Sequence, residues 1–276
     1  MKITGYTHYL PDIKGTLMLL TIFLAGALLG NLLNIGLTCL LGQDFVNSYG
    51  MLVSYPAMFV PVMLYASTQD RRNEHLQKGV PLDRQGFGHK TAAILVLTCI
   101  FSTIASAYLT EPLTALLPPM PAWLEEVMEK MLNDAPLWVS LISASVFAPL
   151  FEEWLCRGLV LRGLLNTMSP LGAICTSSVF FAVLHMNPWQ AIPAFCLGML
   201  FGYVYYRTGS LKLTILMHCA NNTMAVVLSK IPRFQDAETF MDILSPWAYW
   251  SIYAACIMIV LSSLIIFKNT QSNKQH

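Results

Sequence analysis

Charge is scarce in this sequence. Of its 276 residues, 11% are charged and 55% are hydrophobic, and the mean hydropathy is +0.57. A soluble domain carries about 25% charged residues, so we expect the lipid bilayer to be the solvent for much of this surface. The formal net charge of +1 is too small for the basic field that nucleic acid requires, and we expect no nucleic-acid partner.

Cysteine motifs are absent as well. None of the seven cysteines belongs to a C-x-x-C pair, and all lie within or beside apolar runs, where a thiol acts as a small hydrophobic group. We therefore expect no disulfide framework and no cysteine metal site. The sequence also shows no internal repeat, low-complexity tract or second domain. We predict one transmembrane domain over residues 1–276, with a motif-bearing core over 135–229.

Long apolar runs are what the sequence has in abundance. A helix needs about 20 apolar residues to span the hydrocarbon, and backbone polar groups in lipid must be satisfied within the helix. We predict an all-α fold, a polytopic membrane helix bundle with about eight transmembrane helices. The predicted spans are residues 15–42, 45–68, 91–108, 135–151, 163–184, 186–206, 213–229 and 243–267.

A shorter segment between the third and fourth spans is amphipathic. Within residues 121–133, Trp123, Val127 and Met131 recur at helical spacing, and Glu125 and Glu129 occupy the other side of the helix. This pattern predicts one interfacial amphipathic helix.

Lysine and arginine are unevenly distributed over the predicted loops. Residues 69–90 carry five of them, and further basic residues on the same side stand at positions 2, 14, 157, 162, 207, 212, 268 and 274. The opposite loops hold only Lys130, Lys230 and Arg233. Because basic loops stay in the cytoplasm, we predict a multi-pass integral protein of the plasma membrane with both termini cytoplasmic.

Three polar motifs interrupt the later spans, where a charged residue costs roughly 2.5–3.5 kcal/mol on insertion scales. They are E-E-x-x-x-R at Glu152, Glu153 and Arg157, F-x-x-x-H at Phe181 and His185, and H-x-x-x-N at His218 and Asn222. Residues four apart share one helix face, so Glu153 and Arg157 can pair. Glu152 lies about 100° around the helix and can face elsewhere.

The motifs also reach similar depths. Glu152 precedes the turn near 166–170 by about 15 residues and His185 follows it by about 17, so at 1.5 Å rise per residue their heights agree within roughly 4 Å. His218 and Asn222 lie about 9 and 13 residues beyond the turn at 208–209. We expect four polar groups in one layer, where a buried glutamate beside histidines and an asparagine can activate water and stabilise an oxyanion.

Each motif alone has a simpler interpretation. A juxtamembrane ion pair explains E-E-x-x-x-R, and hydrogen-bonded packing explains a lone histidine or H-x-x-x-N. Three motifs in this order on successive spans favour a functional site. Cys156 is an alternative nucleophile, but no residue directs its thiol towards a histidine.

Together, the three motifs resemble the signature of the CPBP family of intramembrane endopeptidases, which includes CAAX prenyl protease 2, the Ras-converting endopeptidase, and bacterial Abi-type proteins. The resemblance covers residues 135–229. It implies an endopeptidase that cleaves a membrane-associated peptide or protein, such as a lipidated or leader-containing one, within the lipid bilayer.

The resemblance also implies a role for each motif residue. Glu152 would activate water with His185 as its partner, Glu153 and Arg157 would form a supporting ion pair, and His218 and Asn222 would make the oxyanion hole. No metal or cofactor is required in this reading. We expect Glu152 to be buried in a cavity that opens to the cytoplasm.

Three other functions stay open. Glu152, His185 and His218 could supply a carboxylate and two imidazoles to zinc in a metal-dependent membrane hydrolase, although H-E-x-x-H is absent. The fold can also serve as a non-catalytic immunity or scaffold protein that binds a membrane peptide without cutting it. A transporter with Glu152 and His185 as a proton relay is disfavoured, because no inverted repeat is found.

Overall fold

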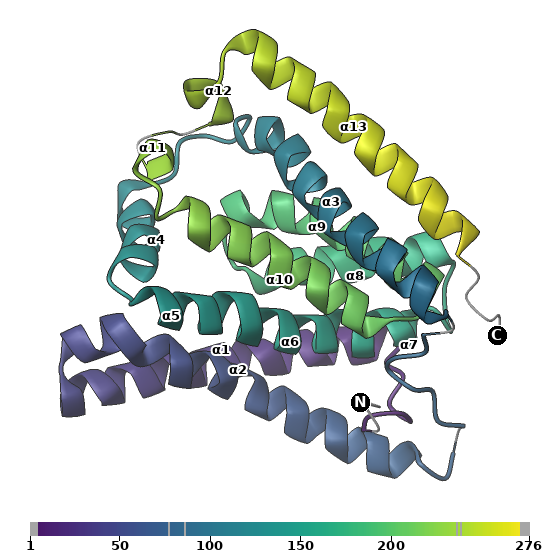
Figure 1. Cartoon of the computed structure of the whole chain (residues 1–276). Helices are drawn as coiled ribbons and strands as arrows, with labels where there is room; N and C mark the ends of the chain where they lie inside the picture. Colours follow the sequence, from purple (N-terminus) through teal and green to yellow (C-terminus); the bar gives the residue numbers. More distant parts are fainter. Residues whose placement is uncertain (1–4, 77, 86, 236, 238, 271–276) are drawn as a thin grey trace.

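A computed structural model describes residues 5–76, 78–85, 87–235, 237 and 239–270 of the chain (Figure 1). Every regular element among them is a helix, as the apolar runs predict. The helices are α1 (Ile13–Leu41), α2 (Gln43–Asn73), α3 (His89–Thr114), α4 (Ala122–Asn133), α5 (Leu137–Ser140), η1 (Leu141–Phe147), α6 (Ala148–Glu153), η2 (Trp154–Leu161), α7 (Arg162–Leu164), α8 (Pro170–Leu184), α9 (Pro188–Thr208), α10 (Leu211–Leu228), α11 (Pro232–Gln235), α12 (Phe240–Ile243) and α13 (Pro246–Asn269).

The apolar helices make this an integral, multi-pass membrane protein. Six stretches within the described residues are long and apolar enough to cross a membrane: Ile13–Leu41, Gln43–Asn73, Thr91–Thr114, Leu137–Leu164, Leu211–Leu228 and Pro246–Asn269. The predicted fifth span is realised as the 15-residue α8, which begins only at Pro170. The predicted sixth span is α9, whose tyrosines, prolines and glutamine reduce its hydropathy. The total of eight spans therefore stays a prediction.

Helices α1 and α2 form a close hairpin whose two arms touch through glycines. Gly42 alone links them, with a φ of 89° that favours glycine. A Cβ atom on Gly26 would lie 2.0 Å from the carbonyl oxygen of Met58, and one on Gly30 would lie 2.7 Å from the Met58 side chain. The spacing G-x-x-x-G thus lets the two backbones approach, as is common between membrane helices.

Replacing Gly26 by Val should destabilise this hairpin. The added side chain would overlap the α2 backbone, and overpacking of this kind typically costs about 1–3 kcal/mol. Thermal unfolding in detergent measures the effect. Gly36→Val is the matched control, because a Cβ at Gly36 meets nothing within 4 Å. Equal melting temperatures for the two variants would contradict the close approach of α1 and α2.

The fourth predicted span is longer than expected and partly π-helical. Helix runs without a break from Leu137 to Leu164 through α5, η1, α6, η2 and α7, with two π-helical stretches at η1 and η2. The sequence prediction ended this span at 151 and placed Arg157 and Arg162 in the loop after it. That assignment is wrong, since both arginines lie inside the helix and are buried. Pi-helical turns recur at functional sites, and here they flank the two glutamates.

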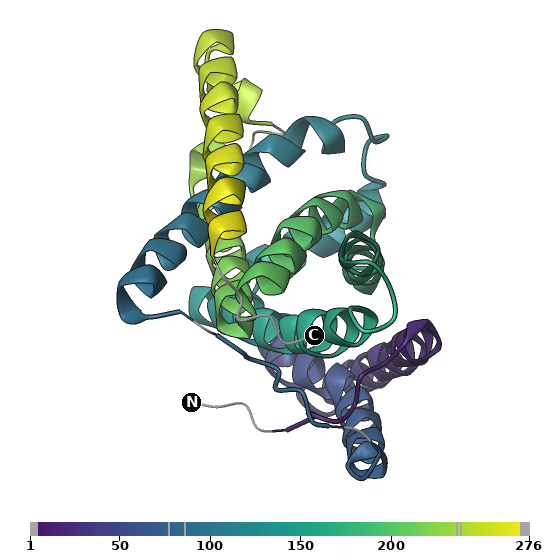
Figure 2. The ribbon, with the colours of Figure 1, turned by 90° about the vertical axis from the view of Figure 1, so that its right-hand side faces the viewer.

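Backbone carbonyls and one arginine hold the N-terminal segment and the segment after α2 together at one end of the bundle. Arg162 donates to the carbonyls of Tyr6, Tyr9 and Val80, with 2.8 Å to that of Tyr9. The start of α10 is held there as well, because Asp83 accepts from the Leu211 amide at 2.9 Å. Figure 2 looks onto this end and shows both the N and C ends of the chain there. That this end faces the cytoplasm stays a prediction.

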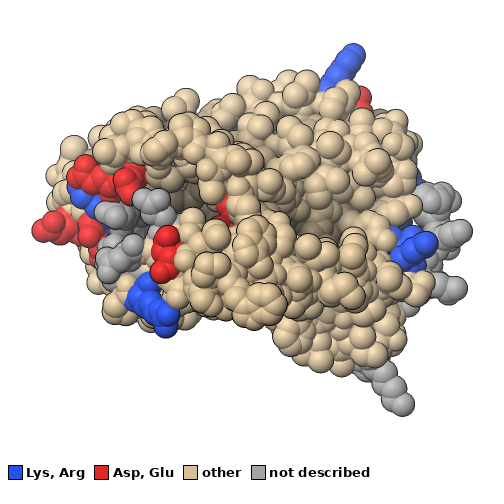
Figure 3. Space-filling model, turned by 90° about the horizontal axis from the view of Figure 1, so that it is seen from above, with Lys and Arg blue, Asp and Glu red and all other residues tan. Residues whose placement is uncertain are grey.

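The amphipathic segment forms α4 at the opposite end of the bundle, near the α1–α2 link (Figure 1). Asn47, close to the start of α2, donates to Asp134 just after α4 at 3.3 Å. The predicted helix is therefore present, and its position at a membrane interface stays a prediction. Figure 3 shows most of the visible acidic side chains at this end, together with some basic ones, and a mostly uncharged surface between them and the basic side chains at the other end.

Candidate active site

The two consecutive glutamates of α6 face different partners. Glu152 points towards α2, where the Tyr55 hydroxyl donates to its Oε1 atom. Its Oε2 atom is buried and has no hydrogen-bond partner among the described residues. The residue is only 9% exposed. One carboxylate oxygen is thus held in place, while the other is buried with its hydrogen-bonding capacity unused.

Glu153 is fully buried and belongs to an ion pair. Arg157 Nη1 lies 2.6 Å from Glu153 Oε1, and neither side chain has any exposed surface. Arg157 also donates to the Gly198 carbonyl of α9 at 3.1 Å, and its guanidinium lies 4.6 Å from the Phe181 ring centre. A buried charge is tolerated only when it is paired and hydrogen-bonded. The predicted pairing of Arg157 with Glu153 is therefore present in the structure.

His218 connects the two glutamates. Its Nδ1 atom lies 3.0 Å from Glu153 Oε1, and its Nε2 atom lies 3.9 Å from Glu152 Oε2. A carboxylate accepts hydrogen bonds, so the Nδ1–H group donates to Glu153. Nε2 is then the ring atom that faces Glu152. The edge of Phe181 packs on the imidazole with 5.5 Å between ring centres, which fixes the plane of the ring.

His185 lies at the end of α8 and faces the same space as Glu152. Its Nδ1–H donates to the Phe181 carbonyl at 2.9 Å, so the Nε2 atom is free to accept a hydrogen bond. No direct hydrogen bond joins His185 to Glu152 among the described contacts, but both side chains line one cavity. The equal depth predicted for the two residues agrees with this arrangement.

Asn222 has a different environment from the other motif residues. Its Nδ2 atom donates to the Ala144 carbonyl in η1 at 2.7 Å, and its Oδ1 atom accepts from Asn221 at 3.0 Å. It is not among the residues that line the cavity of Glu152. In this conformation Asn222 braces the π-helical stretch, and its predicted place in an oxyanion hole stays a prediction.

The cavity around Glu152 has a volume of about 570 Å³. It runs between the α1–α2 hairpin, α4, α6 and the α8–α9 turn. Its lining comprises Phe23, Gly30, Asn31, Asn34, Gln43, Val46, Asn47, Met51, Ser54, Tyr55, Met58, Val127, Lys130, Glu152, Leu184, His185, Met186 and Gln190. Most of its polar wall comes from α1 and α2, which carry none of the residues that the three motifs single out.

One signal in the sequence could have identified that wall. Asn31, Asn34 and Tyr55 are polar groups inside the first two apolar runs, and polar groups at membrane depth need a partner or a water-filled cavity. The three motifs that predict the site each contain a charged residue or a histidine, and none of them includes these neutral side chains.

Two expectations, a cavity that opens to the cytoplasm and termini that lie in the cytoplasm, conflict in this structure. Its lining reaches Gln43, Asn47 and Lys130, which lie at the end with the α1–α2 link. Towards the end that holds the chain termini, buried side chains such as Tyr9, Leu82 and Leu159 form a closed core. A cytoplasmic opening and cytoplasmic termini therefore cannot both be right, because the two lie at opposite ends of the bundle.

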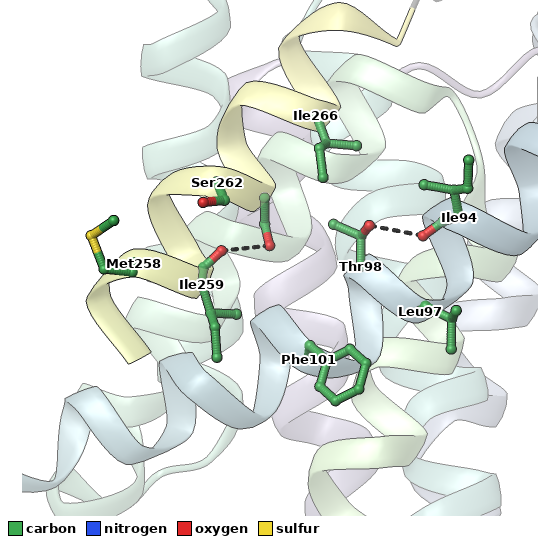
Figure 4. Close-up of a pocket in the computed structure, with 9 residues that line it drawn as sticks. Ile94, Leu97, Thr98, Phe101, Met258, Ile259, Ser262 and Ile266 are labelled. Atoms are coloured by element: carbon green, nitrogen blue, oxygen red, sulfur yellow. Dashed lines mark hydrogen bonds between the residues drawn. The ribbon is translucent and has the colours of Figure 1, made fainter. Parts of the chain in front are cut away.

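A second hollow, between α3 and α13, carries no comparable chemistry (Figure 4). It has a volume of about 550 Å³ and an apolar lining that includes Leu97, Phe101 and Met258. Its hydroxyl groups on Thr98 and Ser263 donate to carbonyls of their own helices, at 2.8 and 2.7 Å. No titratable group faces it, so the Glu152 cavity is the candidate site.

The residues present do not form an evident metal site. Among the described residues, no group of three or more His, Cys, Asp or Glu side chains could hold a metal ion. The Cys156 thiol beside the glutamates is fully buried. Around Glu152, the titratable groups of the cavity lining are a carboxylate, a phenol and an imidazole, and Lys130 lies at its other end.

Comparison with known families agrees with the motifs. Residues 134–224 match the model of the family described as Rce1-like, type II CAAX prenyl endopeptidase. The match covers the helix with the glutamates, α8, α9 and most of α10. No curated protein and no solved structure matches the chain.

Proposed function

We propose that this chain, which belongs to the type II CAAX prenyl endopeptidase family through residues 134–224, cleaves a peptide bond of a membrane-associated substrate with water activated by Glu152. One observation carries this proposal. The Glu152 carboxylate lies in a cavity with Oε1 held by Tyr55 and Oε2 without a partner among the described residues, and His185 lines the same cavity. A general base needs an oriented oxygen that no competing hydrogen bond occupies.

In the proposed reaction, Glu152 Oε2 takes a proton from water as the water oxygen attacks the scissile carbonyl carbon. The resulting tetrahedral oxyanion collapses, the carbon–nitrogen bond breaks, and Glu152 returns the proton to the leaving amine. His185 Nε2, which is free to accept, holds the attacking water. Tyr55 keeps the carboxylate in one orientation, so less motion has to be frozen during attack.

The buried ion pair of Glu153 and Arg157 supports the reaction by positioning His218. Arg157 balances the Glu153 charge, and Glu153 holds Nδ1 of His218 so that Nε2 faces the reacting centre. When the ring is protonated, Nε2–H can donate to the oxyanion, and one such donor contributes about 10²–10³-fold in kcat. Preorganised donors are effective because they need no rearrangement during the reaction.

Cleavage of defined peptides by the purified protein in liposomes tests the proposal. The probes are an internally quenched peptide ending in a farnesylated C-a-a-X sequence and the same peptide without the farnesyl group. We expect cleavage in the presence of a strong chelator, because Glu152 activates water without a metal. Loss of activity in chelator, restored by zinc, would favour the metal-dependent hydrolase. Binding without cleavage would favour a scaffold or immunity protein.

Replacing Asn222 by Ala separates catalysis from packing. If Asn222 turns towards the oxyanion during the reaction, kcat should fall about 10²–10³-fold with KM little changed. If it only braces η1 through the Ala144 carbonyl, the folded yield should fall and the turnover of folded molecules should stay near normal. Turnover per folded molecule, with folding checked by gel filtration, distinguishes the two roles. Thr223→Ala is the neighbouring control, because Thr223 lies on the same helix and is exposed.

A further inference from the structure

We propose that the Glu152 cavity receives an extended peptide segment from the extracytoplasmic side of the membrane, with carboxamide side chains of α1 and α2 binding its backbone. This inference rests on the proposed function, since it names the side and the chemical class of the substrate at the same site. It follows from the direction of the cavity, the distribution of basic residues, and the polar groups on one cavity wall.

The cavity has one closed and one open end. Its floor is Glu152, Tyr55 and His185, and its mouth is Gln43, Asn47 and Lys130. Lys130 and Gln43 are exposed, whereas the core below the floor, with Leu155 and Leu159, has no exposed surface. A substrate therefore reaches Glu152 through the mouth, at the end with the α1–α2 link and α4.

Basic residues identify the side on which this mouth lies. Arg71, Arg72, Lys78 and Arg84 lie in or beside the segment that Arg162 and Gly209 hold at the opposite end. The mouth end carries Lys130 together with acidic residues such as Asp44, Glu125 and Glu126. Basic residues in short loops stay in the cytoplasm, so the mouth faces the extracytoplasmic side.

Carboxamides on the wall are suited to a peptide backbone. Asn31 and Asn34 of α1 and Gln43 and Asn47 of α2 all line the cavity. The Asn34 Oδ1 atom is buried and has no hydrogen-bond partner among the described residues. A carboxamide offers both a donor and an acceptor, as a peptide group does. Gln43 and Asn47 are already partly paired, since Gln43 donates to Asn47 and Asn47 donates to Asp134, so Asn31 and Asn34 have the most free capacity. An extended segment can bind this wall while its scissile bond reaches Glu152.

Labelling of a cysteine deep in the cavity tests the side of access without an activity assay. Ser54 lines the cavity beside Tyr55 and is 5% exposed, so Ser54→Cys reports on the floor. The background replaces the four cysteines that are not buried, Cys39, Cys175, Cys196 and Cys219, by serine. A membrane-impermeant thiol reagent is added to right-side-out vesicles before or after permeabilisation, and Lys78→Cys serves as the control for the other side.

We expect Ser54→Cys to react from the outside and Lys78→Cys to react only after permeabilisation. A pool of short unlipidated peptides should slow the reaction at Ser54→Cys. When the Ser54→Cys protein also carries Asn34→Leu, the peptide concentration that half-protects the thiol from the reagent should be about 2- to 10-fold higher. This is the loss expected for one hydrogen bond. Leu32→Ala is the matched control, because Leu32 lies on the same helix, is exposed and does not line the cavity.

Two results would overturn the inference. Reaction of Ser54→Cys only after permeabilisation would place the mouth in the cytoplasm. Reaction from outside that peptides do not slow, or that Asn34→Leu does not change, would remove the peptide-binding role of the wall. The proposed function fails separately, if Glu152→Gln cleaves peptides as fast as the unchanged protein while the labelling pattern holds.

Discussion

Replacing Glu152 by Gln should lower kcat by about 10²–10⁴-fold, the range that one general base contributes. The amide keeps the size of the side chain and can still accept the Tyr55 hydrogen bond, but it cannot take a proton from water. Because the change removes one buried carboxylate that has no basic partner in direct hydrogen-bond contact, the fold should persist. Turnover of the quenched peptide per folded molecule measures the effect.

Glu126→Gln is the control for this substitution. Glu126 pairs with Lys130 on the exposed face of α4, so its loss should leave turnover unchanged. Tyr55→Phe should give an intermediate loss, because the carboxylate stays but one oxygen is no longer held. Normal turnover in Glu152→Gln would exclude Glu152 as the base and would leave His185 as the candidate base.

Replacing Arg157 by Met should be the most destabilising single substitution in the site. It leaves the Glu153 carboxylate buried without its cation, and breaking a buried ion pair from one side typically costs about 3–5 kcal/mol. The double variant Glu153→Leu/Arg157→Met should recover much of that stability, because it removes both charges. Thermal unfolding in detergent, arranged as a double-mutant cycle, gives the coupling between the two residues.

Lys130→Met provides the matched comparison for the ion pair. Lys130 and Glu126 have the same i,i+4 spacing as Arg157 and Glu153 but lie on an exposed surface. Water screens such pairs, so the melting temperature should hardly change. If Arg157→Met were as stable as Lys130→Met, the buried pair would have no structural role. If the double variant folds but fails to cleave peptides, the pair is needed to position His218.

The motif residues show which features of this site could be predicted from the sequence. Helical spacing correctly joined Arg157 to Glu153, because an i,i+4 pair depends only on local geometry. Counting residues from the turns placed Glu152 and His185 at one depth, and both line one cavity. The roles of Glu152, His185, His218 and Asn222 stay predictions, as does the single domain with its core over 135–229.

Other features depend on contacts that no local pattern encodes. The prediction ended a span where charge begins at Glu152, but helix continues to Leu164 because neighbouring helices bury both arginines. Tyr55 stands 97 positions from Glu152 in the sequence, so only the packing of α2 against α6 reveals it as a partner. The direction of the cavity similarly depends on how the α1–α2 hairpin packs against the remaining helices.

The contacts of Arg162 impose an order on the assembly of the protein. Its guanidinium binds carbonyls of Tyr6 and Tyr9, which precede it by 156 and 153 positions. A ribosome releases the N-terminal residues long before it reaches Arg162, whereas α1 and α2 can pair as soon as both have emerged. The glycine-packed hairpin therefore forms early in synthesis, and the N-terminal segment docks only after more than half of the chain has been made.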